Sequence, residues 1–329
     1  MERNTSKVVL GGGIAASLCV ALTYGVAKLL FSGALDAQWK HSKLRSPGER
    51  PESGPRLDAE EEAAAADWFD QSKQPVVVSA EDDIQLHGWL FDPDCVDAKP
   101  HLYAICCHGY AGEPADMAKY AHRFARMGFT VLTPSMRAHG LSEGRYAGMG
   151  WLDRRDLMRW ISLIVDSDPQ ARILLQGRSM GAAAVMMTVG EPDLPRNVKA
   201  AVEDCGYASV DRQFVDVLRS SFHLPRILAV PIVNTMSLIC ERHAGYGFAQ
   251  ASCLEQLHHA TVPMLFIHGG DDDFVPPRAL DENFDACASI DRQKLLIPSA
   301  GHSMCASTAP IVYWKTIGNF VNRIFHLND

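Results

Sequence analysis

A serine at the centre of the pentapeptide Gly177-Arg178-Ser179-Met180-Gly181 carries the clearest chemical signal in this sequence. An apolar run precedes the pentapeptide and a run of small residues follows it, which is typical of a strand, a sharp turn and a helix. A serine hydroxyl is a weak nucleophile, so an enzyme that uses it exposes the oxygen at such a turn, where a histidine can accept the proton. The two glycines leave room for a turn whose central residue is strained.

A histidine that could accept this proton follows a second apolar run. His302 lies on a short loop with Gly301, directly after residues 294–297, which are expected to form a strand. The ordinary pKa of histidine lets it take up and return a proton near neutral pH. Most of the 13 histidines need no catalytic role. A histidine at the end of a strand is ordinarily a surface residue, but His302 lies 30 residues after Asp272 and Asp272 lies 93 residues after Ser179, and this order makes His302 the candidate general base.

Three aspartates could supply the carboxylate that orients this histidine. Asp271, Asp272 and Asp273 follow the apolar residues 264–268 on a glycine-containing turn. A buried carboxylate there would accept a hydrogen bond from the imidazole and stabilise its protonated form. For Asp271 and Asp273, the alternative is a solvated turn or a helix cap. A calcium loop is disfavoured, because no alternating series of oxygen ligands ends in a glutamate.

A loop that could stabilise negative charge on a substrate oxygen follows residues 101–107, a further hydrophobic run. It begins His108-Gly109-Tyr110 and precedes a helical stretch. Loops of this kind aim a backbone N–H at the oxyanion, and the residue after the nucleophile supplies a second donor. We expect the N–H groups of Tyr110 and Met180 to form the oxyanion hole. For His108, a structural hydrogen bond is expected in preference to direct chemistry.

Together these segments resemble the α/β-hydrolase superfamily, and within it the branch of serine esterases, lysophospholipases and prolyl-oligopeptidase-like enzymes. The resemblance covers residues 74–328, and the order serine, acid, histidine along the chain is the one that this superfamily uses. It implies that the acid is Asp272, four residues after His268, and that the base is His302.

The resemblance extends to two further segments. Residues 80–91 are similar to the early β-hairpin of that branch, and residues 137–144 to its loop after the next core strand. Met136 and Ala138 stand where that loop usually has an aspartate and a glycine, which bears on substrate fit more than on activity. Some members carry the acid after the preceding core strand, so Asp204 is the reserve candidate.

Short apolar runs alternate with helical stretches from residue 75 onward. Strands are expected at 172–176, 198–203, 264–268 and 294–297, and helices near 151–167, 180–190, 277–287 and 309–326. Continuous apolar strands interleaved with helices predict an α/β protein with a mostly parallel central sheet and helices on both faces. The resemblance identifies this as the α/β-hydrolase fold. Since the carboxyl ends of parallel strands share one edge, Ser179, Asp272 and His302 should meet there.

A small helical cap is expected at about 207–256, because this segment is too long for a plain connection after its strand. The segment is strongly apolar. It could line a hydrophobic acyl pocket, or it could be a helical insert packed on the core, and the second interpretation is favoured.

Length and composition fit one large α/β domain with accessory segments. The chain has 329 residues, is 47% hydrophobic and carries a formal net charge of −8. Without a basic cluster we expect no nucleic-acid partner. The nine cysteines form no metal-binding pair, and the adjacent Cys106 and Cys107 should point to opposite faces of a strand and remain unpaired. We expect no metal and no cofactor.

Residues 8–27 are free of charge and long enough to cross a bilayer. Arg3 and Lys7 precede them and Lys28 follows. We expect an uncleaved single-span membrane anchor in preference to a removable signal peptide, and a buried helix is unlikely without a polar stripe. An N-terminal tail inside the cell would place the catalytic domain outside the cytoplasm; secretion after cleavage is the alternative.

The chain is therefore divided into three parts. Residues 1–34 are the membrane anchor or signal peptide, residues 35–73 a linker with a short helix, and residues 74–329 the hydrolase domain that contains the cap. Proline and glycine within residues 46–55 are typical of a linker. The acidic, alanine-rich residues 58–70 predict the helix.

The sequence predicts a serine hydrolase that cleaves a carboxylic ester through an acyl-enzyme, on a small-molecule or lipid-like acyl substrate. A serine peptidase or amidase of the same fold is one alternative, less expected because the sequence carries no large propeller to screen peptides. A non-catalytic protein of this fold that binds a partner or lipid is the other. It is disfavoured because all three catalytic residue types are present. The sequence predicts no oligomeric state.

Overall fold

An 8-stranded sheet forms the centre of the computed structural model. The structure describes residues 2–45, 55–96 and 98–327, with all side chains in these ranges except those of residues 2–18 and 45. The strand order is β1-β2-β4-β3-β5-β6-β7-β8. The strands are β1 (Gln74–Ser79), β2 (Gln85–Phe91), β3 (Leu102–Cys107), β4 (Thr130–Pro134), β5 (Arg172–Arg178), β6 (Val198–Asp204), β7 (Met264–Gly269) and β8 (Arg292–Ile297).

The sheet is antiparallel at one end and parallel elsewhere. Strands β1 and β2 form a hairpin and β2 pairs antiparallel with β4, whereas each pairing from β4 through β3 to β8 is parallel. Parallel strands need crossover segments, and the helices supply them. The predicted mostly parallel sheet is confirmed.

Buried side chains along β3 alternate between the two faces of the sheet. Ala104 and Cys106 join one apolar cluster, while Ile105 and Cys107 join the other. This is the two-residue period of a strand that is covered on both sides. Cys106 and Cys107 are both free thiols on opposite faces, as the sequence predicts.

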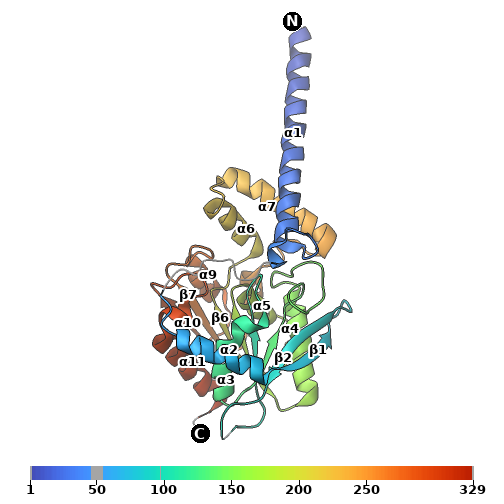
Figure 1. Ribbon diagram of the computed structural model, residues 1–329. Coiled ribbons are helices and arrows are strands. Elements are labelled where there is room, and N and C mark those ends of the chain that lie inside the picture. Colours follow the sequence, from blue (N-terminus) through green and yellow to red (C-terminus); the bar gives the residue numbers. More distant parts are fainter. Residues whose placement is uncertain (1, 46–54, 97, 328–329) are drawn as a thin grey trace.

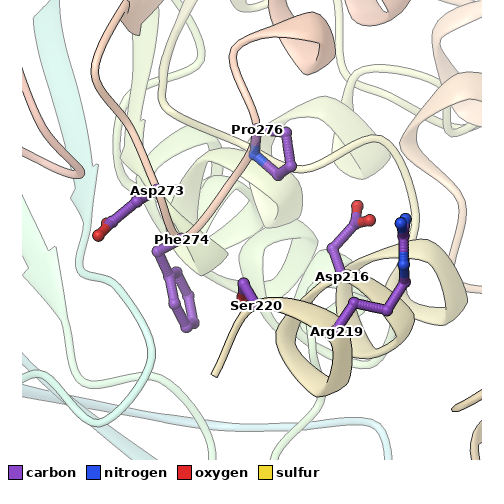
Figure 2. Close-up of a pocket in the computed structure, with 6 residues that line it drawn as sticks. All are labelled: Asp216, Arg219, Ser220, Asp273, Phe274 and Pro276. Atoms are coloured by element: carbon purple, nitrogen blue, oxygen red, sulfur yellow. The ribbon is translucent and has the colours of Figure 1, made fainter. Parts of the chain in front are cut away.

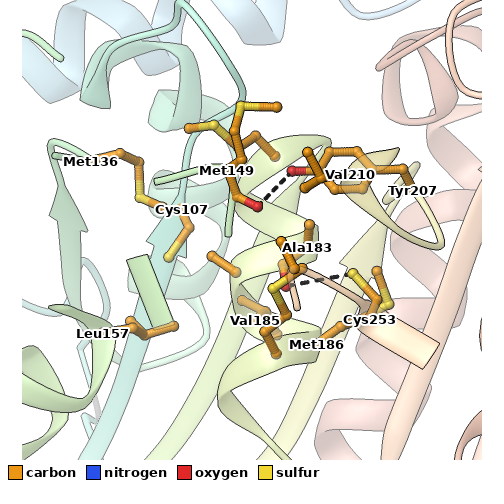
Figure 3. Close-up of a cluster of buried hydrophobic side chains, with 14 of the residues drawn as sticks. Cys107, Met136, Met149, Leu157, Ala183, Val185, Met186, Tyr207, Val210 and Cys253 are labelled. Atoms are coloured by element: carbon orange, nitrogen blue, oxygen red, sulfur yellow. Dashed lines mark hydrogen bonds between the residues drawn. The ribbon is translucent and has the colours of Figure 1, made fainter. Parts of the chain in front are cut away.

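Helices cover both faces of this sheet (Figure 1). One face is covered by α4 (Asp153–Ser167), α5 (Met180–Thr188), α8 (Cys253–Leu257) and α9 (Arg278–Ala286), and the other by α2 (Ala59–Ser72), α3 (Ala118–Arg126), α10 (Cys305–Thr308) and α11 (Pro310–Phe325). Figure 3 shows Ala183, Val185 and Met186 of α5 among side chains of other elements, including Cys107 and Cys253. Helix α5 is thus buried over its whole length, from Met180 to Thr188.

Two helices after β6 form the predicted cap, α6 (Val210–Ser220) and α7 (Arg226–Ala244). Ala229, Val233 and Met236 of α7 are buried in the same apolar cluster as Ala27 and Phe31 of α1 (Glu2–Leu35). Helix α1 therefore packs against α7 near its C-terminal end, and it continues beyond the cap (Figure 1).

The C-terminal end of α1 is also attached to the central domain. Asp36 forms an ion pair with Arg145, and the N–H of Ala147 donates to the carbonyl oxygen of Leu35 over 2.9 Å. Leu35 itself is fully buried. These contacts hold the C-terminal end of α1 against the central domain.

The N-terminal predictions fall partly outside the described residues. Residues 46–54 of the predicted linker are not described, nor are the side chains of residues 8–18 in the predicted membrane segment. Among the helices whose side chains are described, none combines the length and the apolar character needed to cross a membrane. The helix predicted at 58–70 is α2, and its Trp68 and Phe69 both pack on Phe91.

Candidate functional site

Ser179 lies in a strained turn between β5 and α5. Its φ is 55° and its ψ is −115°, a region that residues other than glycine seldom adopt. A Cβ atom on Gly177 would lie 2.3 Å from the carbonyl oxygen of Gly181, and one on Gly181 would lie 2.2 Å from that of Cys107. Both positions therefore require glycine, because the turn packs tightly against itself and against β3.

A row of three side chains starts from this serine. Ser179 Oγ lies 2.8 Å from His302 Nε2, and His302 Nδ1 lies 2.7 Å from Asp272 Oδ2. Since a carboxylate only accepts hydrogen bonds, Nδ1 carries the proton and Nε2 can accept the serine hydroxyl proton. Ser179 and Asp272 are buried and His302 is half-buried. The arrangement can therefore remove a proton from a hydroxyl group.

Asp272 is held by donors on both of its oxygens. Its Oδ1 accepts the N–H groups of Phe274 and Val275, over 3.0 and 2.8 Å. Burial by itself would raise the pKa of this carboxyl, but hydrogen bonds from His268 and His302 hold the pKa well below its usual range. Asp272 therefore stays ionised next to the imidazole of His302.

The other candidate acids take different positions. Asp271 and Asp273 are exposed. Asp204, the reserve candidate, is buried and accepts a hydrogen bond from the hydroxyl of Tyr313 over 2.7 Å. Burial raises the pKa of Asp204, even though this hydrogen bond acts against it. Of the four aspartates, Asp272 is the one for which the structure records a hydrogen bond to His302.

The loop after β3 lies directly beside the serine. A Cβ atom on Gly109 would be 3.3 Å from the Cβ of Ser179 and 3.9 Å from its Oγ. Tyr110 follows this glycine, and its hydroxyl donates to the carbonyl oxygen of Ala34 at the end of α1, over 2.7 Å. Met180 is the first residue of α5, where backbone N–H groups have no partner within the helix. Both predicted oxyanion donors therefore belong to segments that flank Ser179.

Two buried histidines connect this loop to the loop after β4. His108 donates from Nδ1 to the carbonyl oxygen of Gly109 over 2.8 Å, and its Nε2 accepts the N–H of Met136 over 3.0 Å. In His139, Nε2 accepts the N–H of Ala111 over 3.1 Å. Burial lowers the pKa of His108 to about 3 and that of His139 to about 4, so both remain neutral and brace the loops.

Two buried groups, His268 beside Asp272 and Glu203 beside His268, were not identified from the sequence. His268 Nε2 lies 3.0 Å from the carbonyl oxygen of Val275 and 3.3 Å from Asp272 Oδ2, so this nitrogen carries a proton. Glu203, on the neighbouring strand, is also fully buried, and burial raises its pKa to about 8. The only signal in the sequence was the position of His268 four residues before the acid.

A pocket of about 240 Å³ opens beside the row, between α6 and the turn that carries Asp272 (Figure 2). Its lining residues are Asp216, Arg219, Ser220, Asp273, Phe274 and Pro276. The Phe274 ring lies 5.0 Å from the imidazole of His302, centroid to centroid. Phe274 therefore connects the pocket to His302, and α6 of the cap supplies part of the pocket wall.

One group of side chains near the row has ligand atoms that a metal ion could use. Atoms of Cys205, Asp272 and His302 lie within 4.8 Å of one another. Asp272 and His302 are already hydrogen-bonded to each other, and burial raises the pKa of the Cys205 thiol. A metal would have to break the hydrogen bond and deprotonate the thiol, so this donor set fits poorly.

A serine on a strained turn after the central parallel strand, with helices on both faces of the sheet, is the arrangement of the α/β-hydrolase fold. The chain belongs to the family described as serine aminopeptidase, S33, whose model matches residues 98–236 and 240–308. The predicted superfamily and fold class are confirmed, and the chain is a hydrolase-family protein.

Similar proteins come from bacteria, archaea and yeast. The uncharacterized protein YqkD of Bacillus subtilis is 28% identical over 222 residues, which are 67% of this chain and 71% of that protein. The uncharacterized membrane protein YNL320W of Saccharomyces cerevisiae is 23% identical over 201 residues, covering 60% of this chain and 62% of its own length. The solved structure of the Pyrococcus furiosus esterase Pf2001 covers 77% of this chain and 92% of its own, with a TM-score of 0.61 and 21% identity.

Proposed function

We propose that this chain is a serine hydrolase that cleaves carboxylic esters through a covalent acyl-enzyme. The observation that carries the proposal is the hydrogen-bonded row from Ser179 through His302 to Asp272, over 2.8 and 2.7 Å. A hydroxyl, an imidazole and an ionised carboxylate in this order are the components of nucleophilic acyl transfer. The name of the similar archaeal protein, an esterase, supports an ester as substrate.

In the proposed first half-reaction, Ser179 Oγ attacks the ester carbonyl carbon while its proton passes to His302 Nε2. Asp272 stabilises the imidazolium that forms and fixes its tautomer. The N–H groups of Tyr110 and Met180 would donate to the oxyanion of the tetrahedral intermediate. His302 then returns the proton to the departing alkoxide oxygen, and an acyl-enzyme remains on Ser179.

In the second half-reaction, water takes the place of the alcohol. The water oxygen attacks the acyl carbon while His302 accepts a proton from the water, and His302 then returns that proton to Ser179 Oγ. The carboxylic acid leaves and the enzyme is regenerated. All steps use side chains and backbone groups of this chain together with water.

The proposal is tested by labelling the folded protein with a fluorophosphonate and by measuring turnover of acyl esters of graded chain length. We expect labelling and turnover in the wild type and neither in the Ser179→Ala variant. Ser167→Ala, an exposed serine on α4, is the matched control and should behave as wild type. Labelling of a folded Ser179→Ala variant would exclude Ser179 as the nucleophile.

A peptidase or amidase activity at the same residues is the second candidate, and the serine aminopeptidase description of the family favours it. Labelling of Ser179 does not separate the two activities, because both use the same nucleophile. Parallel turnover of short acyl esters and of aminoacyl anilides does separate them. A non-catalytic binding role would be indicated if the Ser179→Ala variant kept full biological function.

We further propose a membrane-tethered protein with three parts: an anchor in residues 1–34, a connecting segment in residues 35–73, and the hydrolase domain in residues 74–329. The support is the charge-free stretch at 8–27 and the name of the yeast relative, which is called a membrane protein. A lipid-like acyl substrate would fit this location. Extraction of cell membranes at alkaline pH tests the tether, and protease protection tests whether the hydrolase domain lies outside the cytoplasm.

A further inference from the structure

Helix α1 exposes apolar side chains. Val20, Leu22 and Tyr24 lie in the part that extends beyond the cap, and Leu29 lies where the helix meets α7. Burial begins at Ala27, where the helix reaches α7. A helix in contact with water carries a polar face, yet Lys28 is the only charged side chain between residues 19 and 35. The exposed side chains of this segment would therefore be more stable in an apolar environment than in water.

The cap carries a second set of exposed apolar side chains. These are Phe222, Ile227, Leu228 and Leu238. The opposite face of α7, with Ala229, Val233 and Met236, is buried in the cluster that includes α1. We call the two exposed sets the apolar collar; it contains half of the large apolar side chains that are exposed in the described residues. Soluble surfaces rarely concentrate apolar side chains in this way.

Basic side chains accompany the collar. Arg219, Arg226 and Arg242 are exposed, and Glu241 is the only acidic residue in 219–245. This segment has a formal charge of +2, from three arginines and one glutamate, whereas the whole chain carries −8. Basic residues beside exposed apolar ones favour a surface that offers both hydrocarbon and negative charge, which is the surface of an anionic bilayer.

The relative position of α1 and the cap fits such a surface. Figure 1 shows α1 crossing α7 and continuing past the cap on the side where α6 and α7 lie. From Gly25 back to Glu2 the helix is about 36 Å long at 1.5 Å per residue, compared with about 30 Å for a hydrocarbon core. Tyr24 lies at the end of this helical segment next to the cap, and tyrosine is enriched at membrane–water interfaces.

We propose that the apolar collar docks on the surface of an anionic lipid bilayer, with the cap lying in the interface beside α1. This inference adds to the proposed anchor a direct contact between the cap and lipid. The inference rests on the proposed anchor and is independent of the proposed chemistry. Since α6 lines the pocket beside His302, docking would place that pocket close to acyl groups in the membrane (Figure 2).

Fluorescence quenching tests the contact of the cap with lipid. The full chain is reconstituted into phosphatidylcholine vesicles with and without phosphatidylglycerol, using lipids brominated near the headgroup end of the acyl chains. Leu228→Trp probes the collar. Ile290→Trp is the matched control, because Ile290 is fully exposed and lies just before the start of β8, at the amino ends of the parallel strands and away from the cap. The signal of the six native tryptophans is subtracted with the parent protein.

We expect the added emission of Leu228→Trp to be largely lost with brominated lipid, and that of Ile290→Trp to be unchanged. Equal quenching of both variants would overturn the inference. Protection of residues 222–238 from hydrogen exchange without quenching would point to a second copy of the chain as the occupant, and would also overturn it. If the full chain failed to associate with vesicles, the anchor and this inference would both fall, while fluorophosphonate labelling would still report on the chemistry.

The anionic component is tested by a double variant, Arg226→Gln with Arg242→Gln, in the Leu228→Trp protein. We expect the gain in quenching from phosphatidylglycerol to be lost in this variant. Arg126→Gln, an exposed arginine on α3, is the matched control and should keep the gain. Quenching that never depends on phosphatidylglycerol would contradict the anionic preference.

Discussion

The edge of the sheet that carries Ser179, Asp272 and His302 and the region of α1 and the cap are organised in opposite ways. At the edge, Ser179, Asp272 and His139 are buried and hydrogen-bonded to side chains or backbone of neighbouring loops. In the cap region, Ile227 and Leu228 expose 80% and 53% of their surface.

This difference shows where each region finds its partners. Ser179, His302 and Asp272 find their hydrogen-bond partners within the chain itself, which holds them at hydrogen-bonding distances before any substrate arrives. The apolar side chains of the cap leave surface that water covers at a cost of about 25 cal/mol per Å². The comparison therefore predicts large losses from small changes at the edge and small losses from changes at the collar.

The largest loss is expected for Ser179→Ala. The nucleophilic oxygen is removed, and in a well-studied serine protease the same change lowers kcat about 10⁶-fold. Steady-state turnover of an acyl ester measures this, and circular dichroism shows whether the fold is kept. If the variant retained more than a small fraction of wild-type kcat, the edge would not be the catalytic region.

Asp272→Asn should cost less, about 10⁴-fold in kcat, because the amide no longer holds His302 in the productive tautomer. Asp271→Asn, one residue earlier and exposed, is the matched control and should keep wild-type kcat. Both are measured as kcat on the same ester. Comparable losses in the two variants would mean that the acid has been assigned to the wrong residue.

His139, which accepts a hydrogen bond from the loop after β3, should make stability depend on pH. Burial lowers the pKa of His139 from 6.5 to about 4, so its contribution is fully present above pH 6.5 and is lost as the pH falls toward 4. Relative to His139→Gln, the wild type should lose on the order of 3 kcal/mol across this window. Urea unfolding at several pH values measures the difference. A difference that stayed constant with pH would contradict a neutral, buried His139.

The smallest effect is expected at the collar. Leu228→Ala in detergent solution should change the free energy of unfolding by no more than about 0.5 kcal/mol, since an exposed side chain loses little contact. Met236→Ala on the buried face of the same helix is the positive control, with an expected cost of about 2–5 kcal/mol. Thermal or urea unfolding compares them. A large cost for Leu228→Ala would mean that the collar is part of the core.

The sequence predicted those elements whose signal is local. The strand expected at 264–268 is β7 (Met264–Gly269), and the helix expected at 180–190 is α5 (Met180–Thr188). Continuous apolar runs bounded by glycine are visible without knowing the fold. The meeting of Ser179, Asp272 and His302 was predicted from the shared edge of parallel strands, and their catalytic roles remain a prediction.

Contacts between distant loops had no such signal. The hydrogen bond from the N–H of Ala111 to His139, and the position of His268 beside Asp272, depend on how loops from different strands approach one another. The same holds for the packing of α7 on α1, because an apolar segment does not reveal which neighbour covers it. These features required the three-dimensional arrangement.

The hydrogen bond from the Tyr110 hydroxyl to the carbonyl oxygen of Ala34 makes a mechanical link between α1 and the loop that lies beside Ser179. If α1 is inclined by the thickness or curvature of its surroundings, the acceptor moves and the tyrosine follows it. The reactivity of the serine would then respond to strain in the helix. A truncated chain that begins after residue 35 would lack this acceptor, so any activity it showed would describe a loop that is no longer bonded to α1.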